Sequence, residues 1–156
     1  MKTYLLRREQ WVPRPVEVVF AYFAEAQNLE SVTPPWLAFR ILTPLPIVMQ
    51  AGTRITYRIR LHGCPIRWVT EIENWEPPTQ FVDIQLRGPY RFWHHTHRFE
   101  AVDGGTRISD TVQYALPLGP LGRLANRWFV QADLAAVFDY RAEQVASLFG
   151  PPRGTE

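Results

Sequence analysis

The chain contains little cysteine, almost no lysine and no long hydrophobic run. Among its 156 residues Cys64 is the only cysteine, so no intramolecular disulfide can form. No stretch approaches the roughly 18 consecutive apolar residues of a transmembrane helix, and the first residues lack the pattern of a secretory signal. We therefore expect a cytoplasmic protein without stable membrane insertion.

Lysine is nearly absent from the basic residues. Lys2 is the only lysine among the 17 basic residues, and the arginines are scattered along the chain. Nucleic-acid binding depends on basic side chains gathered on one face, where they neutralise neighbouring phosphates. With a formal net charge of +2 and no basic block, we expect no nucleic-acid partner. The sequence leaves the oligomeric state open.

Hydrophobic and aromatic residues are plentiful, at 46% and 13% of the chain. This length and composition suit one domain with one core. We expect a single domain over residues 1–150 and a flexible tail over 151–156, where proline and glycine are frequent.

The order of the expected elements is the most informative feature of the sequence. Residues 3–12 read as a strand, and two short helical segments follow, one near 13–25 and one near 26–36. Hydrophobic alternation and turn residues then predict a continuous antiparallel series of strands. These strands are expected near 37–43, 52–63, 65–78, 80–88, 91–102 and 105–117.

A long helix is predicted over residues 121–149. Apolar residues recur there at intervals of three and four, which gives one stripe along the helix. Gly150 and the prolines after it end the helix. The predicted stripe comprises Leu124, Trp128, Gln131, Leu134, Val137, Phe138, Arg141, Val145 and Leu148.

This layout resembles the START-like or SRPBCC superfamily, which includes birch-pollen-allergen proteins, lipid-transfer domains and polyketide cyclase/dehydratases. The resemblance rests on "VPRPVEVVFAYFAEAQNLESVTPPW" after the first strand and on "GTRISDTVQYALPLGPLG" before the last helix. The spacing of Trp68, Ile72 and Trp75 and the strand "GPYRFWHHTHRF" resemble a bacterial polyketide cyclase/dehydratase-like branch.

The resemblance implies an α+β helix-grip fold. In that fold a curved antiparallel sheet of about six to seven strands wraps around a long C-terminal α-helix, and two short helices follow the first strand. It also implies an interior cavity for an apolar or amphipathic small molecule. The superfamily contains both carriers and enzymes, so the fold alone does not assign the chemistry.

The strand near 91–102 carries the candidate site. Its alternation places Trp93, His95, His97 and Phe99 on one face, which we expect to point inward, and His94 on the other. The turn at Asp103 and Gly104 predicts a two-residue hairpin loop. The resulting register sets His97 opposite Asp110 and makes the two interior cross-strand neighbours.

The strand near 80–88 is ambiguous, because either face could be inward by apolarity. The resemblance favours the face of Asp83 and Gln85. These residues, with His95, His97 and Asp110, would then form a polar band inside an aromatic cage. The predicted cage comprises Trp68, Phe81, Trp93, Phe99, Tyr114 and Trp128.

Four interpretations of the polar band follow. As a carrier or sensor, the protein would orient the polar end of a ligand with the band and bury its body among the aromatics. As a cyclase or dehydratase acting on a polyketide-like or aromatic substrate, it would use His97 with Asp110 as an acid/base pair, with His95 beside them. The band could also be a hydrogen-bonded network inside a filled core.

The fourth interpretation is a metal site of His95, His97 and Asp110, the ligand types of non-haem iron centres. A His-x-His strand is also typical of the all-β cupins, but the long helix has no place in a cupin. We favour the carrier interpretation and expect neither a metal nor a cofactor. Trp36 is expected at the cavity mouth, and Arg141 either reaches an interior carboxylate such as Asp83 or extends to solvent.

Overall fold

The computed structural model describes residues 1–150, and the predicted tail at 151–156 lies outside the described residues. Seven strands form one antiparallel sheet in the order β1-β7-β6-β5-β4-β3-β2. The strands are β1 (Tyr4–Val12), β2 (Arg40–Ile41), β3 (Arg54–Leu61), β4 (Cys64–Glu76), β5 (Gln80–Arg87), β6 (Phe92–Val102) and β7 (Gly105–Ala115).

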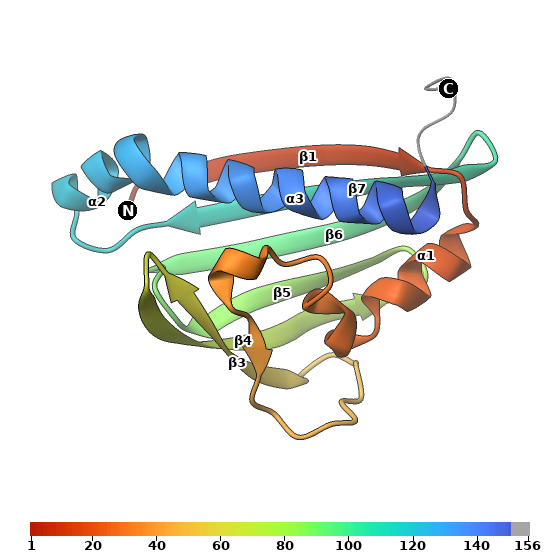
Figure 1. Ribbon diagram of the computed structural model, residues 1–156, viewed down its shortest axis with the longest axis horizontal. Coiled ribbons are helices and arrows are strands. Elements are labelled where there is room, and N and C mark those ends of the chain that lie inside the picture. The colour runs from red at the N-terminus through yellow and green to blue at the C-terminus, as the bar shows by residue number, and fades with distance from the viewer. Residues whose placement is uncertain (151–156) are drawn as a thin grey trace.

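Helices cover one side of this sheet (Figure 1). The first is α1 (Val16–Phe23), which begins after Pro15, and the short 3-10 helices η1 (Ala26–Leu29) and η2 (Pro35–Leu37) follow it. The C-terminal helical region consists of α2 (Pro120–Ala125), a π-helical turn η3 (Asn126–Val130) and α3 (Gln131–Phe149). The predicted helix-grip layout is confirmed, with one interruption in the long helix.

The interior divides into two groups of buried side chains. One lies under α1 and the C-terminal end of α3, where Phe20, Phe23 and Phe99 pack with Val145 and Phe149. The other lies between the N-terminal half of α3 and the middle strands, around Trp68, Trp93, Tyr114, Leu134 and Phe138. The chain therefore has a phenylalanine-rich end and a tryptophan-rich end.

The hairpin register predicted for the last two strands is confirmed. Val102 pairs with Gly105 across the turn, and His97 pairs with Asp110. Asp103 and Gly104 both have a positive φ, of 52° and 78°, as a two-residue hairpin turn of this type requires. This register fixes which β7 side chains lie beside the histidines.

The predicted stripe of the long helix is only partly confirmed. Leu134, Phe138, Arg141 and Val145 are buried and Val137 is half-buried, but Leu124, Trp128, Gln131 and Leu148 are exposed. The π turn before Gln131 holds more residues than an α turn, so it rotates the preceding residues out of line with the buried face of α3. The stripe that faces the sheet therefore begins after η3.

No helix among residues 1–150 is long and apolar enough to cross a membrane.

Candidate functional site: a cavity with a buried histidine–aspartate cluster

A cavity of about 650 Å³ lies between the sheet and α3. Its wall includes side chains from η2, from strands β3 to β6 and from α3, and most of that wall is apolar or aromatic. A cavity of this size accommodates a drug-sized organic molecule. Trp36, which is exposed, borders it and contacts Tyr140 of α3 edge to face, with ring centroids 6.0 Å apart.

Strand β6 contributes the histidines to one wall of the cavity. Trp93, His95, His97 and Phe99 are all buried, as the alternation predicts. His94 points to the opposite face, where its Nε2 lies 3.5 Å from Glu73 Oε1. The predicted directions of the three histidines, with His95 and His97 inward and His94 outward, are therefore confirmed.

Strand β5 supplies the second acidic group of the cluster. Asp83 is the cross-strand neighbour of His95, and it lines the cavity. Phe81 lines the cavity too and stacks on His97, with ring centroids 4.0 Å apart. Gln85 belongs to the predicted face but serves another purpose. Its side-chain amide donates to the Tyr90 carbonyl and its side-chain oxygen accepts from the Tyr90 N–H, so it holds the β5–β6 loop.

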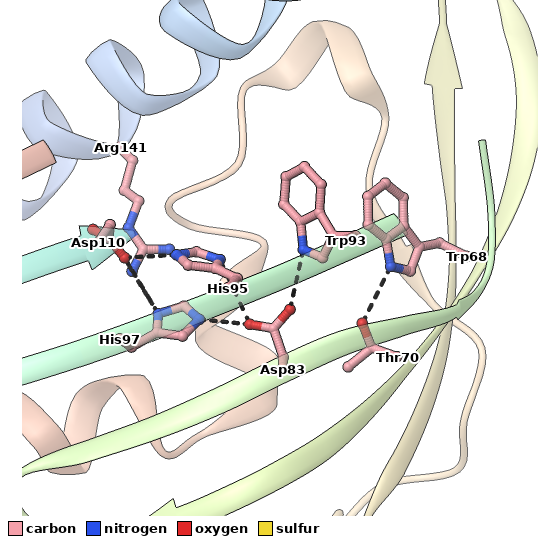
Figure 2. A network of polar contacts seen from close by, with 8 residues as sticks. All are labelled: Trp68, Thr70, Asp83, Trp93, His95, His97, Asp110 and Arg141. Atoms are coloured by element: carbon pink, nitrogen blue, oxygen red, sulfur yellow. Dashed lines mark hydrogen bonds and ion pairs between the residues drawn. The ribbon is translucent and has the colours of Figure 1, made fainter. Parts of the chain in front are cut away.

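The histidines and aspartates are connected crosswise (Figure 2). His95 Nε2 lies 2.8 Å from Asp110 Oδ1, and His97 Nε2 lies 2.6 Å from Asp83 Oδ2. His97 and Asp110, the predicted partners, do lie opposite each other on β6 and β7. Their side chains are farther apart, however, with His97 Nδ1 3.4 Å from Asp110 Oδ1. The two imidazoles stack, with ring centroids 3.6 Å apart.

Arg141 of α3 completes the cluster from the helix side. Its Nη2 lies 3.2 Å from Asp110 Oδ1 and 3.3 Å from His97 Nδ1. The sequence predicted an interior carboxylate as one of its two possible destinations, and the carboxylate it contacts is Asp110 instead of Asp83. The guanidinium also lies over the ring of Phe23, 4.9 Å from its centroid.

These contacts fix the hydrogen positions on both histidines. Because arginine only donates hydrogen bonds, the contact with Arg141 makes His97 Nδ1 the acceptor, so Nε2–H of His97 donates to Asp83. His95 Nε2–H donates to the ionised Asp110. Both ring nitrogens of His97 are thus engaged. His95 Nδ1, by contrast, has only Asp83 Oδ2 near it among the described residues, at 3.6 Å.

The charges of the cluster follow from burial and from these contacts. Burial lowers the pKa of His97 to about 4, despite the opposing effect of Asp83, so this imidazole is neutral at pH 7. Burial by itself would raise the pKa of Asp110, but Arg141 and the histidines outweigh it and hold that pKa below its usual value. His95, His97 and Trp93 likewise outweigh burial and keep the pKa of Asp83 low.

Three side chains of the cluster are close enough to bind one metal ion. Asp83, His95 and His97 each offer a ligand atom within 4.8 Å of the others. The predicted metal triad contained Asp110 in place of Asp83. However, Nε2 of His97 carries the proton donated to Asp83, so a metal there would have to displace that hydrogen and reverse the tautomer that Arg141 favours. The donor set fits a hydrogen-bonded cluster better than a metal centre.

The structure places six of the predicted ligand-binding residues on the cavity wall, namely Trp68, Phe81, Asp83, Trp93, His95 and His97. Asp110 lies behind the histidines, and Phe99 belongs to the phenylalanine-rich end. Tyr114 is buried and donates its hydroxyl to Asn126 Oδ1 at 2.7 Å. These three residues support the site without lining the cavity.

Trp128 is a correction to the sequence prediction. Its side chain is 67% exposed and does not line the cavity, because it lies in the π turn and not on the buried face of α3. The structure adds Tyr57, Tyr90 and Phe138 to the aromatic wall instead. Tyr57 lies on the apolar face of an alternating strand, which is a usable signal, whereas the loop position of Tyr90 carries no periodic signal.

Comparison with known proteins agrees with this geometry. Residues 6–150 match the family described as polyketide cyclase / dehydrase and lipid transport, and the chain belongs to this family within the START-like or SRPBCC superfamily. None of the curated proteins matches the chain.

Solved structures share the fold at low sequence identity. The protein TTHA0849 of Thermus thermophilus is 22% identical, with a TM-score of 0.65 over 93% of this chain and 99% of that one. The protein CV1439 of Chromobacterium violaceum is 15% identical, with a TM-score of 0.71 over 96% and 99% of the two chains. The protein Ara h 8.0201 is 16% identical, with a TM-score of 0.60 over 94% of this chain and 99% of that one. Identities this low establish the fold alone.

Proposed function

We propose that the protein is a carrier or sensor that binds a hydrophobic or amphipathic small molecule in the cavity between the sheet and α3. The observation that carries this proposal is the cavity itself, about 650 Å³ with a largely apolar wall that includes aromatic side chains, and with a compact polar cluster at one side. Apolar walls with a few placed polar groups are the usual construction of small-molecule sites. The described family, which includes lipid transport, supports the same function.

The polar cluster suits orientation of a ligand. Each residue of the cluster is hydrogen-bonded to another residue of the cluster, and only the sides of Asp83 and His95 that face the cavity remain open. The cluster is therefore preorganised and does not have to rearrange when a ligand enters. A filled core would need no such hollow beside buried polar groups, because interiors pack closely.

Native mass spectrometry of the protein purified from its own host tests this proposal. We expect a co-purifying small molecule that is lost on denaturation. In Val137→Trp the new indole would occupy the cavity, because Val137 lines it, and the adduct should disappear. Ala136→Trp is the matched control, since Ala136 lies next to it on α3 and is exposed. An adduct that survives Val137→Trp, or is lost equally in both variants, would contradict the proposal.

A second candidate, a cyclase or dehydratase, is favoured by one contact. His95 Nε2–H donates to Asp110, which is the arrangement that orients an imidazole for proton transfer at its other nitrogen. The base would then be His95 and not His97, whose two nitrogens are both engaged. Under this candidate, His95→Gln abolishes the loss of water from a poly-β-ketone probe, and the protein with His97→Gln keeps part of it. Absence of turnover by the wild-type protein with a bound probe would leave only the binding function.

A further inference from the structure

The charge balance of the cluster restricts which ligands can bind. This inference rests on the proposed binding function and concerns the polar end of the ligand. Asp83 and Asp110 are two carboxylates, and Arg141 is one permanent cation, already paired with Asp110 at 3.2 Å. His97 is neutral at pH 7. Even with His95 protonated, the cluster would have no surplus positive charge with which to receive an anionic ligand.

The groups left open toward the cavity are acceptors. Oδ2 of Asp83 accepts the hydrogen bond of His97, whereas Oδ1 has a single long contact with Trp93 Nε1, at 3.4 Å. The side chain of Asp83 is 16% exposed, about twice the 8% of Asp110 and the largest value in the cluster. His95 Nδ1 lies 3.6 Å from Oδ2, the oxygen that already accepts from His97. Oδ1 of Asp83 is therefore the acceptor with the most capacity left for a donor group of a ligand.

The surrounding rings limit the shape of what can approach Asp83. Trp68 and Trp93 meet edge to face at an interplanar angle of 90°, and Tyr90 packs against both. Tyr57 stacks on Trp68. Such walls favour an aromatic body, and their π faces also attract cations.

We infer that the cavity selects ligands whose polar end donates a hydrogen bond to Asp83, as a hydroxyl or an ammonium group does, on an aromatic body, and that it discriminates against carboxylate-ended molecules such as fatty acids. A hydrogen bond to a charged acceptor contributes roughly tenfold or more to affinity. A carboxylate would instead place two like charges together at a buried site.

Four naphthalene derivatives that differ only in their polar end test this inference by calorimetric titration at pH 7.5. They are 2-naphthol, 2-naphthylmethylamine, 2-methoxynaphthalene and 2-naphthoate. The naphthol or the amine, or both, should bind at least about tenfold more tightly than the methoxy compound, which cannot donate, and the naphthoate should bind weakest. The two donors also distinguish a neutral hydroxyl from a cation.

Asp83→Asn should reduce the preference for donors over naphthoate by about tenfold. Asp139→Asn is the matched control, because Asp139 is a carboxylate on the exposed side of α3 that pairs with Arg8 and does not line the cavity, and the order of the four compounds should be unchanged. Naphthoate binding as tightly as the donors, or equal effects of the two variants, would overturn the inference. Equal binding of all four compounds would overturn it while the binding function stands. If none of them binds and no small molecule co-purifies, both proposals fail.

A second observation, independent of the cavity, concerns the surface of α2, η3 and the turn before them. Five large apolar side chains there are between 54% and 74% exposed: Leu118, Leu121, Leu124, Trp128 and Phe129. We call them the α2 patch. Figure 1 shows α2 at one end of the molecule, near the N-terminus. The side of this segment that faces the protein carries Gly122 and Asn126 instead, which are buried. Exposed apolar side chains gathered in one segment are typical of interaction sites.

The charged residues within this segment are all basic. Arg123 and Arg127 are the only charged residues between Asp110 and Asp133. Arg123 also borders a surface hollow with Lys2 and Arg91, and none of the described residues that line that hollow is acidic. Two copies of the chain joined through this patch would bring arginine against arginine without an acid in the segment. An anionic lipid surface complements both the charge and the apolar side chains.

We propose that the α2 patch docks the protein on anionic membranes without spanning them. Flotation with vesicles of phosphatidylcholine containing phosphatidylglycerol should show binding that falls as salt rises, with little binding to phosphatidylcholine alone. The double variant Trp128→Ser, Phe129→Ser should lose most of it. Leu45→Ser with Val48→Ser, which changes two other exposed apolar residues, is the control and should bind normally.

Two results would overturn this second proposal. One is equal binding, or none, to the two kinds of vesicle. The other is a concentration-dependent dimer in sedimentation velocity that the double variant abolishes, because the patch would then serve a second copy of the chain.

Discussion

The two ends of the interior use aromatic residues in opposite ways. At the phenylalanine-rich end, Phe99 is 2% exposed and meets Phe20 and Phe23 with ring centroids 5.2 and 5.5 Å apart, under α1. At the tryptophan-rich end, Trp68 and Trp93 touch each other but also line the cavity. There η2 and the N-terminal half of α3 supply the cover, and no full helix among residues 1–150 corresponds to α1. Aromatic side chains therefore fill the space under α1, whereas under η2 and the N-terminal half of α3 they form part of a cavity wall.

Truncation of Phe99 should have the largest effect on stability. Phe99→Ala removes a ring surrounded on all sides, and we expect a loss of about 3–5 kcal/mol in the free energy of unfolding. Trp68→Ala should cost less, because Trp68 lines the cavity and the part of its surface that borders the hollow has no protein contacts to lose. Urea denaturation of both variants gives the comparison. Equal losses would mean that the tryptophan-rich end is as closely packed as the other.

Loss of Arg141 should have the next largest effect on stability. Arg141 belongs to the polar cluster, which lies between the two ends of the interior. Arg141→Met leaves Asp110 buried without its cationic partner, which we expect to cost about 3 kcal/mol. The double variant with Asp110→Asn should recover part of that loss, since no unpaired charge then remains. A single variant as stable as the wild type would show that the cluster belongs to the cavity and contributes nothing to the core.

The pH dependence of stability should reveal the neutral imidazole. The pKa of His97 is about 4 in the folded protein and near 6.5 in the unfolded chain. Between these values the unfolded chain binds the additional proton, so stability should rise with pH from about 4 to 6.5 and then level off. Asp83 and Asp110, with lowered pKa values, add a loss of stability at still lower pH.

The His97→Gln variant separates these contributions. We expect its urea midpoint to change less between pH 4 and 6.5 than that of the wild type, because the group that titrates there in the unfolded chain is missing. An unchanged slope would assign the pH dependence to other residues.

The smallest effect is expected at the edge of the cavity. His62, in the turn between β3 and β4, lies 2.8 Å from Asp133 of α3, and both side chains are well exposed. His62→Ala should change stability by less than about 1 kcal/mol, because exposed pairs contribute little. It should nevertheless speed the exchange of a bound naphthalene probe in stopped-flow measurements, since the pair connects the strands to the helix. Unchanged exchange would show that the ligand enters elsewhere.

Much of this organisation follows from the sequence. The alternation in β6 determined that His95 and His97 point inward and His94 outward, because successive side chains of a strand lie on opposite faces. The turn at Asp103 and Gly104 determined the register, and with it the position of Asp110 beside His97. The order of the elements identified the helix-grip fold through its resemblance to the START-like superfamily. Local geometry decides the side-chain directions and the hairpin register, so a single sequence is enough to predict those two features.

The tertiary structure decided what local geometry cannot. The pairing of His95 with Asp110 and of His97 with Asp83 depends on how β5, β6, β7 and α3 approach one another, and the β4–β5 pairing contains two register shifts that no periodicity reveals. The π turn that leaves Trp128 exposed breaks a pattern that reads as one continuous helix. The cavity arises because curvature and cover leave a volume unfilled, and that volume depends on distances between distant parts of the chain, which residue spacing does not encode.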